Sequence, residues 1–312
     1  LCATGTLGQI IPPSICLVLL GEVISNAYQQ SQLEAGVFAP SFVSIGDLFA
    51  GALIPGLLLV LGYGIYVVLF ATSRPDDVPS NKELILEQDK GKMLMNVAKG
   101  LLPPVTLVLA VLGSILKGVA TPTEAASVGA VGAILLAIIK GNISFNVLQE
   151  VSLETMRTTS MIYLILIGAT IFSSVFRGFG GEDLIESFLT ALPGGILSAT
   201  FVVMVFIFLL GFILDFIEIT FMVVPLVGPV LLGMGIDPIW LGVMIAINLQ
   251  TSFLTPPFGF SLFYLRSVLP DTVDTSQIYR GVAPFIVIQI LILLLIALQP
   301  GIATWLPSYF QR

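Results

Sequence analysis

Long stretches of this sequence contain no charged side chain. They follow one another along the whole chain and cover residues 48–73, 100–116, 125–139, 187–214, 219–236, 238–265 and 281–311. Charged residues make up only 10% of the 312 residues, whereas soluble globular domains carry about a quarter. Because a helix needs about 20 apolar residues to cross the hydrocarbon core of a bilayer, the pattern predicts a polytopic membrane protein and excludes a water-soluble one.

The apolar stretches are continuous rather than alternating, which is typical of helices and not of barrel strands. We therefore predict an all-α fold. The chain contains no histidine, which excludes histidine-based metal sites and the commonest general base. Its two cysteines, Cys2 and Cys16, lack metal-ligand spacing and are interpreted as buried thiols. The 12 basic residues form no run, so we expect no nucleic-acid partner.

Two segments interrupt the predicted helices at proline pairs. Residues 4–14 (TGTLGQIIPPS) contain Pro12-Pro13, and residues 250–257 (QTSFLTPP) contain Pro256-Pro257. Proline removes a backbone donor and clashes with the preceding helical turn, so half-length helices are expected over 15–24, 238–249 and 258–269. Non-helical backbone at membrane depth is tolerated where it faces protein or a watery cavity. The alternative is a proline kink filled by neighbouring helices.

Two acids lie deep in another apolar region. Residues 198–214 and 221–236 are each short for a span, and the segment between them carries Asp215 and Glu218. Two short helices that meet at a polar tip predict a re-entrant hairpin over 198–236. Acids inside a membrane usually have functions, so both are candidate site residues. Alternatively, Asp215 caps a helix near the interface and Glu218 faces a watery cavity.

The distribution of basic residues predicts how the chain crosses the membrane. The segments 74–99, 140–157 and 270–280 hold eight of the 12 basic residues, and basic loops favour the cytoplasmic side. This orientation makes the hairpin enter from outside. It makes the two interrupted helices cross in opposite directions and leaves a last span over 281–306.

The two interrupted helices also indicate an inverted repeat. The Pro12-Pro13 pair matches Pro256-Pro257, and residues 48–51 followed by Pro55 match residues 278–281 followed by Pro284. Paired, interrupted segments in the two halves of a chain mark the binding site of a secondary transporter. We expect residues 1–73 to close the first repeat, 74–99 to be a cytoplasmic connector and 100–312 to form the second repeat. A chain that begins with Leu and lacks the first hairpin is interpreted as N-terminally truncated.

Interrupted helices supply the oxygens that a hard cation such as sodium needs. We predict an ion site from hydroxyls, freed carbonyls and one acid, formed by Thr4, Gly5, Gly8, Pro12, Ser14, Asp215, Thr220, Thr251, Ser252, Thr255 and Pro256. The glycines let backbone approach an ion closely. Because half-helix N-termini attract anions, we also predict a substrate site formed by Pro13, Glu218, Pro257, Gly259 and Arg266. Alternatively, Arg266 anchors the cytoplasmic interface.

Several motifs, in this order, resemble those of one family: GTLGQIIPPSI, GVATPTEAA, LDFIEITFMVVPLVGPVL, GIDPIWLGVMIAINLQ and TSFLTPPFGFSLFYLR. The chain resembles the large membrane subunit (DctM-like) of tripartite ATP-independent periplasmic (TRAP) transporters over nearly its whole length. Within GVATPTEAA, Thr121 to Glu124 is interpreted as a structural helix start with Pro122 in the first turn.

The resemblance implies an elevator-type transporter in the bacterial inner membrane, with a fold like that of the ion transporter superfamily. It implies sodium-coupled uptake of a carboxylate-bearing organic acid that a periplasmic binding protein delivers. It also implies a small four-helix membrane subunit that braces the scaffold. Sodium would lie between each hairpin and its interrupted helix. Since the first hairpin is missing here, one sodium site would be half present and this chain alone is not expected to transport.

Other function classes remain as alternatives. A proton-coupled organic-anion transporter would share the same architecture. A channel would also contain re-entrant segments, although these usually repeat around a symmetric pore. An intramembrane enzyme would need catalytic residues, and Asp215 and Glu218 alone are a poor set without histidine.

Overall fold

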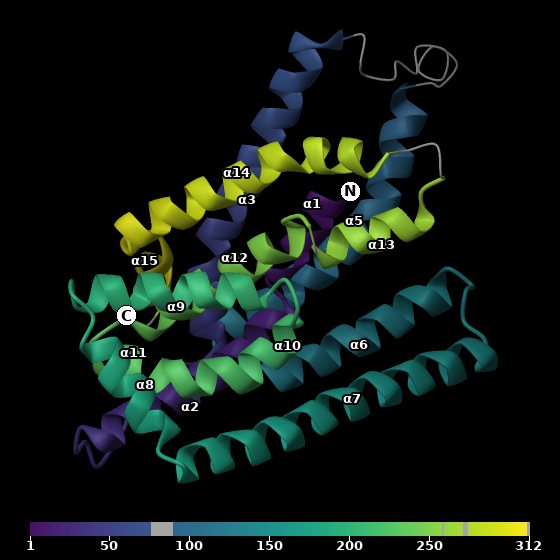
Figure 1. Cartoon of the computed structure of the whole chain (residues 1–312). Coiled ribbons are helices and arrows are strands. Elements are labelled where there is room, and N and C mark those ends of the chain that lie inside the picture. Colours follow the sequence, from purple (N-terminus) through teal and green to yellow (C-terminus); the bar gives the residue numbers. More distant parts are fainter. Residues whose placement is uncertain (76–89, 258, 271–273, 311–312) are drawn as a thin grey trace. The chain divides into compact units, whose positions relative to one another are not determined.

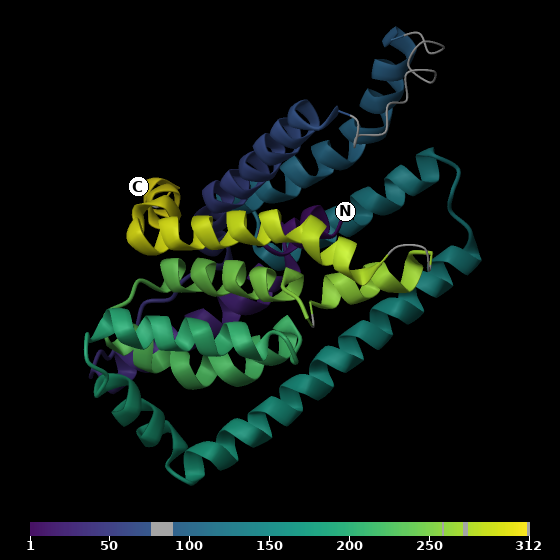
Figure 2. The same cartoon turned by 45° about the horizontal axis from the view of Figure 1, so that its top comes forward.

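The computed structural model describes residues 1–75, 90–257, 259–270 and 274–310, without the side chains of residues 90–94. Regular structure in these ranges is helical throughout, with no strand (Figures 1 and 2). The prediction of an all-α fold is therefore confirmed. Of the predicted connector 74–99, residues 76–89 lie outside the described ranges.

The helices follow one another along the chain with short connections between most of them. They are α1 (Cys2–Thr6), η1 (Leu7–Gln9), α2 (Ile15–Glu34), α3 (Ile45–Ser73), α5 (Lys90–Leu116), α6 (Pro122–Ile139), α7 (Phe145–Gly178), α8 (Gly181–Thr190), α9 (Ile196–Leu210), α10 (Phe216–Glu218), the π-helical turn η3 (Ile219–Val223), α11 (Val224–Gly233), α12 (Pro238–Leu254), α13 (Phe260–Val268), α14 (Thr275–Leu298) and α15 (Gly301–Phe310).

Six helical segments in the described ranges are long and apolar enough to cross a membrane: Ile45–Ser73, Met95–Leu116, Pro122–Ile139, Phe145–Gly178, Phe216–Gly233 and Thr275–Leu298. The shorter helices α9 and α12 are also apolar. The chain is therefore a multi-pass membrane protein, as its charge-free stretches predict. The inverted repeat and the sidedness of the loops remain predictions.

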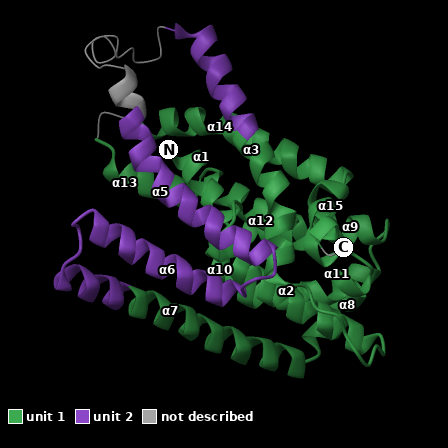
Figure 3. Ribbon diagram, turned by 180° about the vertical axis from the view of Figure 1, so that it is seen from behind, with its two compact units in different colours: residues 1–60, 155–312 green, residues 61–154 purple. Residues whose placement is uncertain are grey.

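The chain forms two compact units, one of residues 1–60 and 155–312 and one of residues 61–154 (Figure 3). In the smaller unit, α6 packs against α5 through glycine. A Cβ atom added at Gly129 would lie 3.3 Å from the side chain of Val111, so the two helices already approach closely there. At the start of α6, Thr121 and Glu124 form a reciprocal capping box behind Pro122. This confirms the interpretation of the sequence around Thr121 as a helix start.

The larger unit is built around α12, whose residues from Leu241 to Leu254 are all buried. Its neighbours include α2, α9 and α14. Glycines bring α3 close to both α12 and α15. A Cβ atom at Gly51 would lie 2.5 Å from the side chain of Ile239 and 2.9 Å from the carbonyl oxygen of Ala303, and one at Gly242 would lie 2.7 Å from Leu48. Larger residues would force these helices apart.

Three helix boundaries differ from those expected. Helix α2 does not stop near residue 24 but continues to Glu34, because no glycine or proline lies between Gly21 and Gly36 to end it. Helix α12 continues through residues 250–254, which were expected to be unwound. The last predicted span, 281–306, is divided into α14 and α15, because Pro300 disfavours helical geometry at Gln299, whose φ and ψ are −128° and 76°.

Candidate functional site

The first interrupted segment lies between α1 and α2. Residues Ile10 to Ser14 are not helical, and the Pro12-Pro13 peptide bond is cis. Ser14 has two roles in this segment, because its Oγ donates to the Gln9 carbonyl oxygen at 2.5 Å and accepts from the Leu17 N–H at 3.3 Å. The serine thus supplies a donor that Pro13 cannot supply, and it caps the first turn of α2.

The second interrupted segment joins α12 to α13 and also contains a cis bond, Pro256-Pro257. Other groups replace the two N–H donors that these prolines lack. The Ser252 carbonyl oxygen accepts from the Thr255 N–H at 3.1 Å, and the Phe253 carbonyl oxygen accepts from Ser261 Oγ at 2.8 Å. Gly259 is required there, since a Cβ atom would lie 2.8 Å from the Phe253 carbonyl oxygen.

The hydroxyls of this segment bond to helix α12 itself. Thr251, Ser252 and Thr255 donate to the carbonyl oxygens of Ile247, Leu249 and Thr251 at 2.7, 2.8 and 2.7 Å. Because Thr251 and Ser252 lie within the helix, the break is shorter than predicted and, among the described residues, covers Thr255 to Pro257 and Gly259. Each hydroxyl oxygen keeps a lone pair that can accept from, or coordinate, another group.

The polar tip connects α9 to α11 and is held by its own acids. Asp215 Oδ1 accepts from the Phe216 N–H at 2.7 Å, and Glu218 Oε2 accepts from the Asp215 N–H at 3.2 Å. Both side chains are half-buried. This is the capping arrangement foreseen as an alternative for Asp215. Each carboxylate still has oxygen lone pairs available, since it can accept about four hydrogen bonds.

Helix α12 brings the tip and both interrupted segments together. The tip contacts it through Phe216, whose ring centroid lies 6.3 Å from that of Phe253, and through Gly211, where an added Cβ atom would lie 2.8 Å from the Ser252 Cβ atom. Helix α1, which precedes the first segment, contacts α13 through Cys2, whose Sγ donates to the Ser261 carbonyl oxygen at 3.1 Å. Segments far apart in the sequence therefore meet at the end of α12 (Figure 1).

A cavity of about 420 Å³ lies between the first segment and α13. Its walls include Gly5, Thr6, Gln9, Ser261 and Tyr264. Of the predicted site residues, only Gly5 lines it. The others are distributed around it as follows: Thr4, Gly8, Pro13 and Pro257 are exposed, Thr255, Pro256 and Arg266 are partly buried, and Pro12, Ser14, Thr220, Thr251, Ser252 and Gly259 are buried. Thr4 bonds locally to the Leu1 carbonyl oxygen at 2.9 Å.

Buried polar groups without a partner reveal candidates that the sequence analysis did not assign. Thr220 Oγ1, Gln9 Oε1 and both amide atoms of Gln250 have no hydrogen-bond partner among the described residues. Thr220 was predicted, but the two glutamines were not. A buried polar group without a protein partner is destabilising, so such groups mark places that can bind an ion or a polar ligand. A glutamine side chain within a charge-free stretch of sequence is the signal that would have identified Gln9 and Gln250.

The ligands available here are mainly uncharged oxygens. Within the described ranges, no three His, Cys, Asp or Glu side chains come together in a way that could hold a metal ion. Carbonyl, hydroxyl and amide oxygens with one nearby carboxylate suit a hard monovalent cation better than a transition metal. Helix α13 also begins in this region. Its first residue is Phe260, and no side chain caps its N-terminus.

Comparison with known families decides what kind of protein carries this site. The family described as "Tripartite ATP-independent periplasmic transporter, DctM component" matches residues 1–302. The chain belongs to the DctM family. It is therefore a component of a transporter and not an enzyme. Its membership confirms the resemblance that the sequence motifs indicated.

Curated relatives in the DctM family match nearly the whole chain. The sialic acid TRAP transporter large permease protein SiaM of Vibrio cholerae is 29% identical over 99% of this chain and 66% of its own length. The C4-dicarboxylate TRAP transporter large permease protein DctM of Pseudomonas aeruginosa is 28% identical over 99% and 66%. The C4-dicarboxylate permease DctM of Vibrio cholerae is 28% identical over 99% and 67%. The chain spans about two thirds of the length of these relatives.

Proposed function

We propose that the chain is the membrane-embedded permease part of a TRAP transporter that takes up an organic acid by coupling its movement to sodium. The observation that carries this proposal is the set of buried oxygens on α12 and on η3, which follows the tip that contacts α12. Thr220 Oγ1 and Gln250 Oε1 lack partners, and Thr251 and Ser252 keep hydroxyl lone pairs. A sodium ion needs several such oxygens, and Asp215 offers a compensating charge.

The proposed substrate class follows from the relatives and from the helix ends. Relatives of this chain include permeases named for sialic acid, for C4-dicarboxylates and, in Oleidesulfovibrio alaskensis, for isethionate, all of which are organic anions at neutral pH. The uncapped N-terminus of α13 leaves backbone N–H groups directed toward the second interrupted segment, and such groups attract anions. Membership in the family of tripartite periplasmic transporters supports a periplasmic binding protein, a small membrane subunit and an inner-membrane location as further parts of the proposal.

The first experiment measures sodium binding without a known substrate. Thermal unfolding of the full-length permease with its small subunit is compared in sodium and potassium chloride at equal ionic strength. A ligand that binds the native state at 100 times its Kd stabilises it by about 2.7 kcal/mol. We expect the unfolding midpoint to be higher in sodium. Equal midpoints in the two salts would contradict sodium binding.

Thr220→Val tests the location of the ion. Valine matches threonine in shape and removes only a buried hydroxyl that has no partner, so the variant should be at least as stable as the wild type in potassium. We expect it to lose the stabilisation by sodium. Thr190→Val is the control, because Thr190 is exposed on α8, and it should retain the full effect. An unchanged sodium effect in Thr220→Val would remove that hydroxyl from the site.

Proton coupling is the second candidate, because Asp215 and Glu218 are half-buried acids at the tip. Uptake into proteoliposomes that contain the permease, its small subunit and its binding protein separates the two. A sodium gradient should drive saturable uptake at constant pH. Uptake driven only by a pH gradient would favour proton coupling, and unsaturable flux in both conditions would favour a channel.

A further inference from the structure

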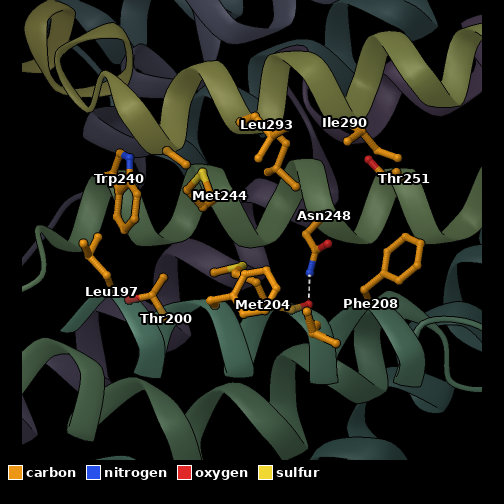
Figure 4. Close-up of a pocket in the computed structure, with 14 residues that line it drawn as sticks. Leu197, Thr200, Met204, Phe208, Trp240, Met244, Asn248, Thr251, Ile290 and Leu293 are labelled. Atoms are coloured by element: carbon orange, nitrogen blue, oxygen red, sulfur yellow. Dashed lines mark hydrogen bonds between the residues drawn. The ribbon is translucent and has the colours of Figure 1, made fainter. Parts of the chain in front are cut away.

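A second cavity lies along α12 and reaches the candidate site only at Thr251. It has a volume of about 390 Å³ and is enclosed by α9, α12 and α14. Figure 4 shows that side chains from all three helices point into it. The cavity falls within the range of roughly 300–1,000 Å³ in which proteins bind small ligands.

The few polar groups in this cavity already bond to backbone. Asn248 Nδ2 donates to the Met204 carbonyl oxygen at 2.8 Å (Figure 4). Thr200 Oγ1 and Thr251 Oγ1 donate to the carbonyl oxygens of Ile196 and Ile247 at 2.8 and 2.7 Å. The Trp240 indole N–H donates to the Ile296 carbonyl oxygen at 2.9 Å. The remaining lining residues are apolar, so the occupant is an apolar group and not a solute anion, ion or water.

The cavity adjoins a surface that faces apolar solvent. Two of its lining residues on α9, Leu197 and Phe201, are 79% and 69% exposed, and Leu294 on α14 is 53% exposed. On a membrane protein such side chains contact lipid. Met204 and Met244 line the same cavity but are only 8% and 4% exposed. A hydrocarbon chain that enters the cavity from the lipid side therefore contacts Met204 and Met244, which lipid on the outer surface does not contact.

The length of the cavity matches a single hydrocarbon chain. Its lining residues on α12 extend from Trp240 to Thr251, which is about 16 Å of helix at 1.5 Å per residue. Half of the hydrocarbon core of a bilayer is about 15 Å thick. Trp240 lies near one end, three residues after the capping Asp237, and tryptophan is typical of the membrane interface.

We propose that this cavity binds one acyl chain of a membrane lipid, inserted between α9, α12 and α14. The acyl chain fills an apolar space beside α12 that would otherwise remain empty. It also packs against α9, which forms one arm of the predicted hairpin. Phospholipids and free fatty acids share this chemistry, and the experiment below distinguishes them.

The test is photolabelling of the full-length permease in nanodiscs. One arm contains a phospholipid with a diazirine in the middle of an acyl chain, and a second contains a fatty acid with the same group. The labelled residues are identified by mass spectrometry. We expect label on Met204 and Met244 from the phospholipid. Label from the fatty acid alone would identify a free acid as the source, and label confined to exposed residues in both arms would overturn the proposal.

Ala297→Phe places a ring in the cavity, because Ala297 lines it. We expect labelling of Met204 and Met244 to fall about fivefold or more, because the phenyl ring occupies the space that the acyl chain needs and a filled cavity does not accept further groups. Leu291→Phe is the matched control on the same helix, since Leu291 is exposed and outside the cavity, and it should label like the wild type. Equal labelling in both variants would contradict the proposal. If Ala297→Phe does not fold, the wild-type labelling pattern still decides.

Discussion

Gly211 follows the last residue of α9 and leaves no room for a side chain. An added Cβ atom would lie 2.8 Å from the Ser252 Cβ atom and closer still to its Oγ. The tip that carries Asp215 can therefore approach α12 only while residue 211 is glycine. Together with the contact between the Phe216 and Phe253 rings, this close approach holds the tip against α12.

Gly211→Ala should lower the free energy of unfolding by about 1–3 kcal/mol, because the new methyl group overpacks against Ser252. The measurement is thermal unfolding of the full-length permease. Adding Ser252→Gly should recover part of the loss, which a double-mutant cycle would show as a coupling energy. Gly233→Ala is the control, since nothing lies within 4 Å of an added Cβ atom there. Equal effects at Gly211 and Gly233 would contradict the close contact.

At the scale of elements, helix starts are set by local bonds. Thr121 Oγ1 accepts from the Glu124 N–H at 3.3 Å, and Glu124 Oε2 accepts from the Thr121 N–H at 2.8 Å. These bonds satisfy two of the donors that a helix start leaves free. Thr121 and Glu124 therefore fix where α6 begins.

Thr121→Ala should destabilise the protein by about 1 kcal/mol, the usual effect of losing such a cap. Thr121→Ser should restore most of it. Thr123→Ala, two residues further on the same exposed turn, should be neutral because alanine favours helix. Denaturant unfolding of the three variants side by side gives the comparison. A loss as large in Thr123→Ala as in Thr121→Ala would show that the cap contributes little.

Local rules in the sequence predict many of these helices. The rule for the residue before a proline places some helix ends more accurately than the QTSFLTPP motif does. The residue before a proline leaves helical geometry, so Pro256 and Pro300 by themselves place the ends of α12 and α14 near Leu254 and Leu298. The polar residues of QTSFLTPP instead predict a break that begins earlier, at Gln250. Helices accept Ser and Thr whose hydroxyls bond to the preceding turn, as Thr251 and Ser252 do.

The candidate site was less predictable than the fold, for a physical reason. The residue types that could supply oxygens were visible in the sequence. Which of them are buried without a partner depends on contacts between distant segments, such as those that enclose Thr220 and Gln250. The exposure of Thr4 likewise depends on which segments pack around it.

At the scale of the whole molecule, the two turns that flank α6 should lie on opposite sides of the membrane. Lys117 is an exposed residue before α6, and Asn142 is an exposed residue after it. The distribution of basic residues places residue 117 outside and residue 142 inside. This pair of positions tests the predicted orientation with one helix between them.

Single cysteines at these two positions, in a background that lacks Cys2 and Cys16, provide the measurement. A membrane-impermeant maleimide added to spheroplasts should label Lys117→Cys and leave Asn142→Cys unlabelled until the membrane is opened. The reverse pattern would invert the proposed orientation. Labelling of both before opening would show that α6 does not span.

The burial of α12 has a consequence for how the protein is made. Its side chains from Leu241 to Leu254 are all buried, and they include Asn248 and Gln250. Bulk lipid therefore does not surround this helix in the finished fold, and the single acyl chain proposed above is its one lipid contact. During synthesis, insertion of α12 into the bilayer is only weakly favourable by itself, because the helix is short and Asn248 and Gln250 interrupt its apolar sequence. Insertion of α12 into the membrane therefore depends on neighbouring helices that pack around it, so this region inserts cooperatively.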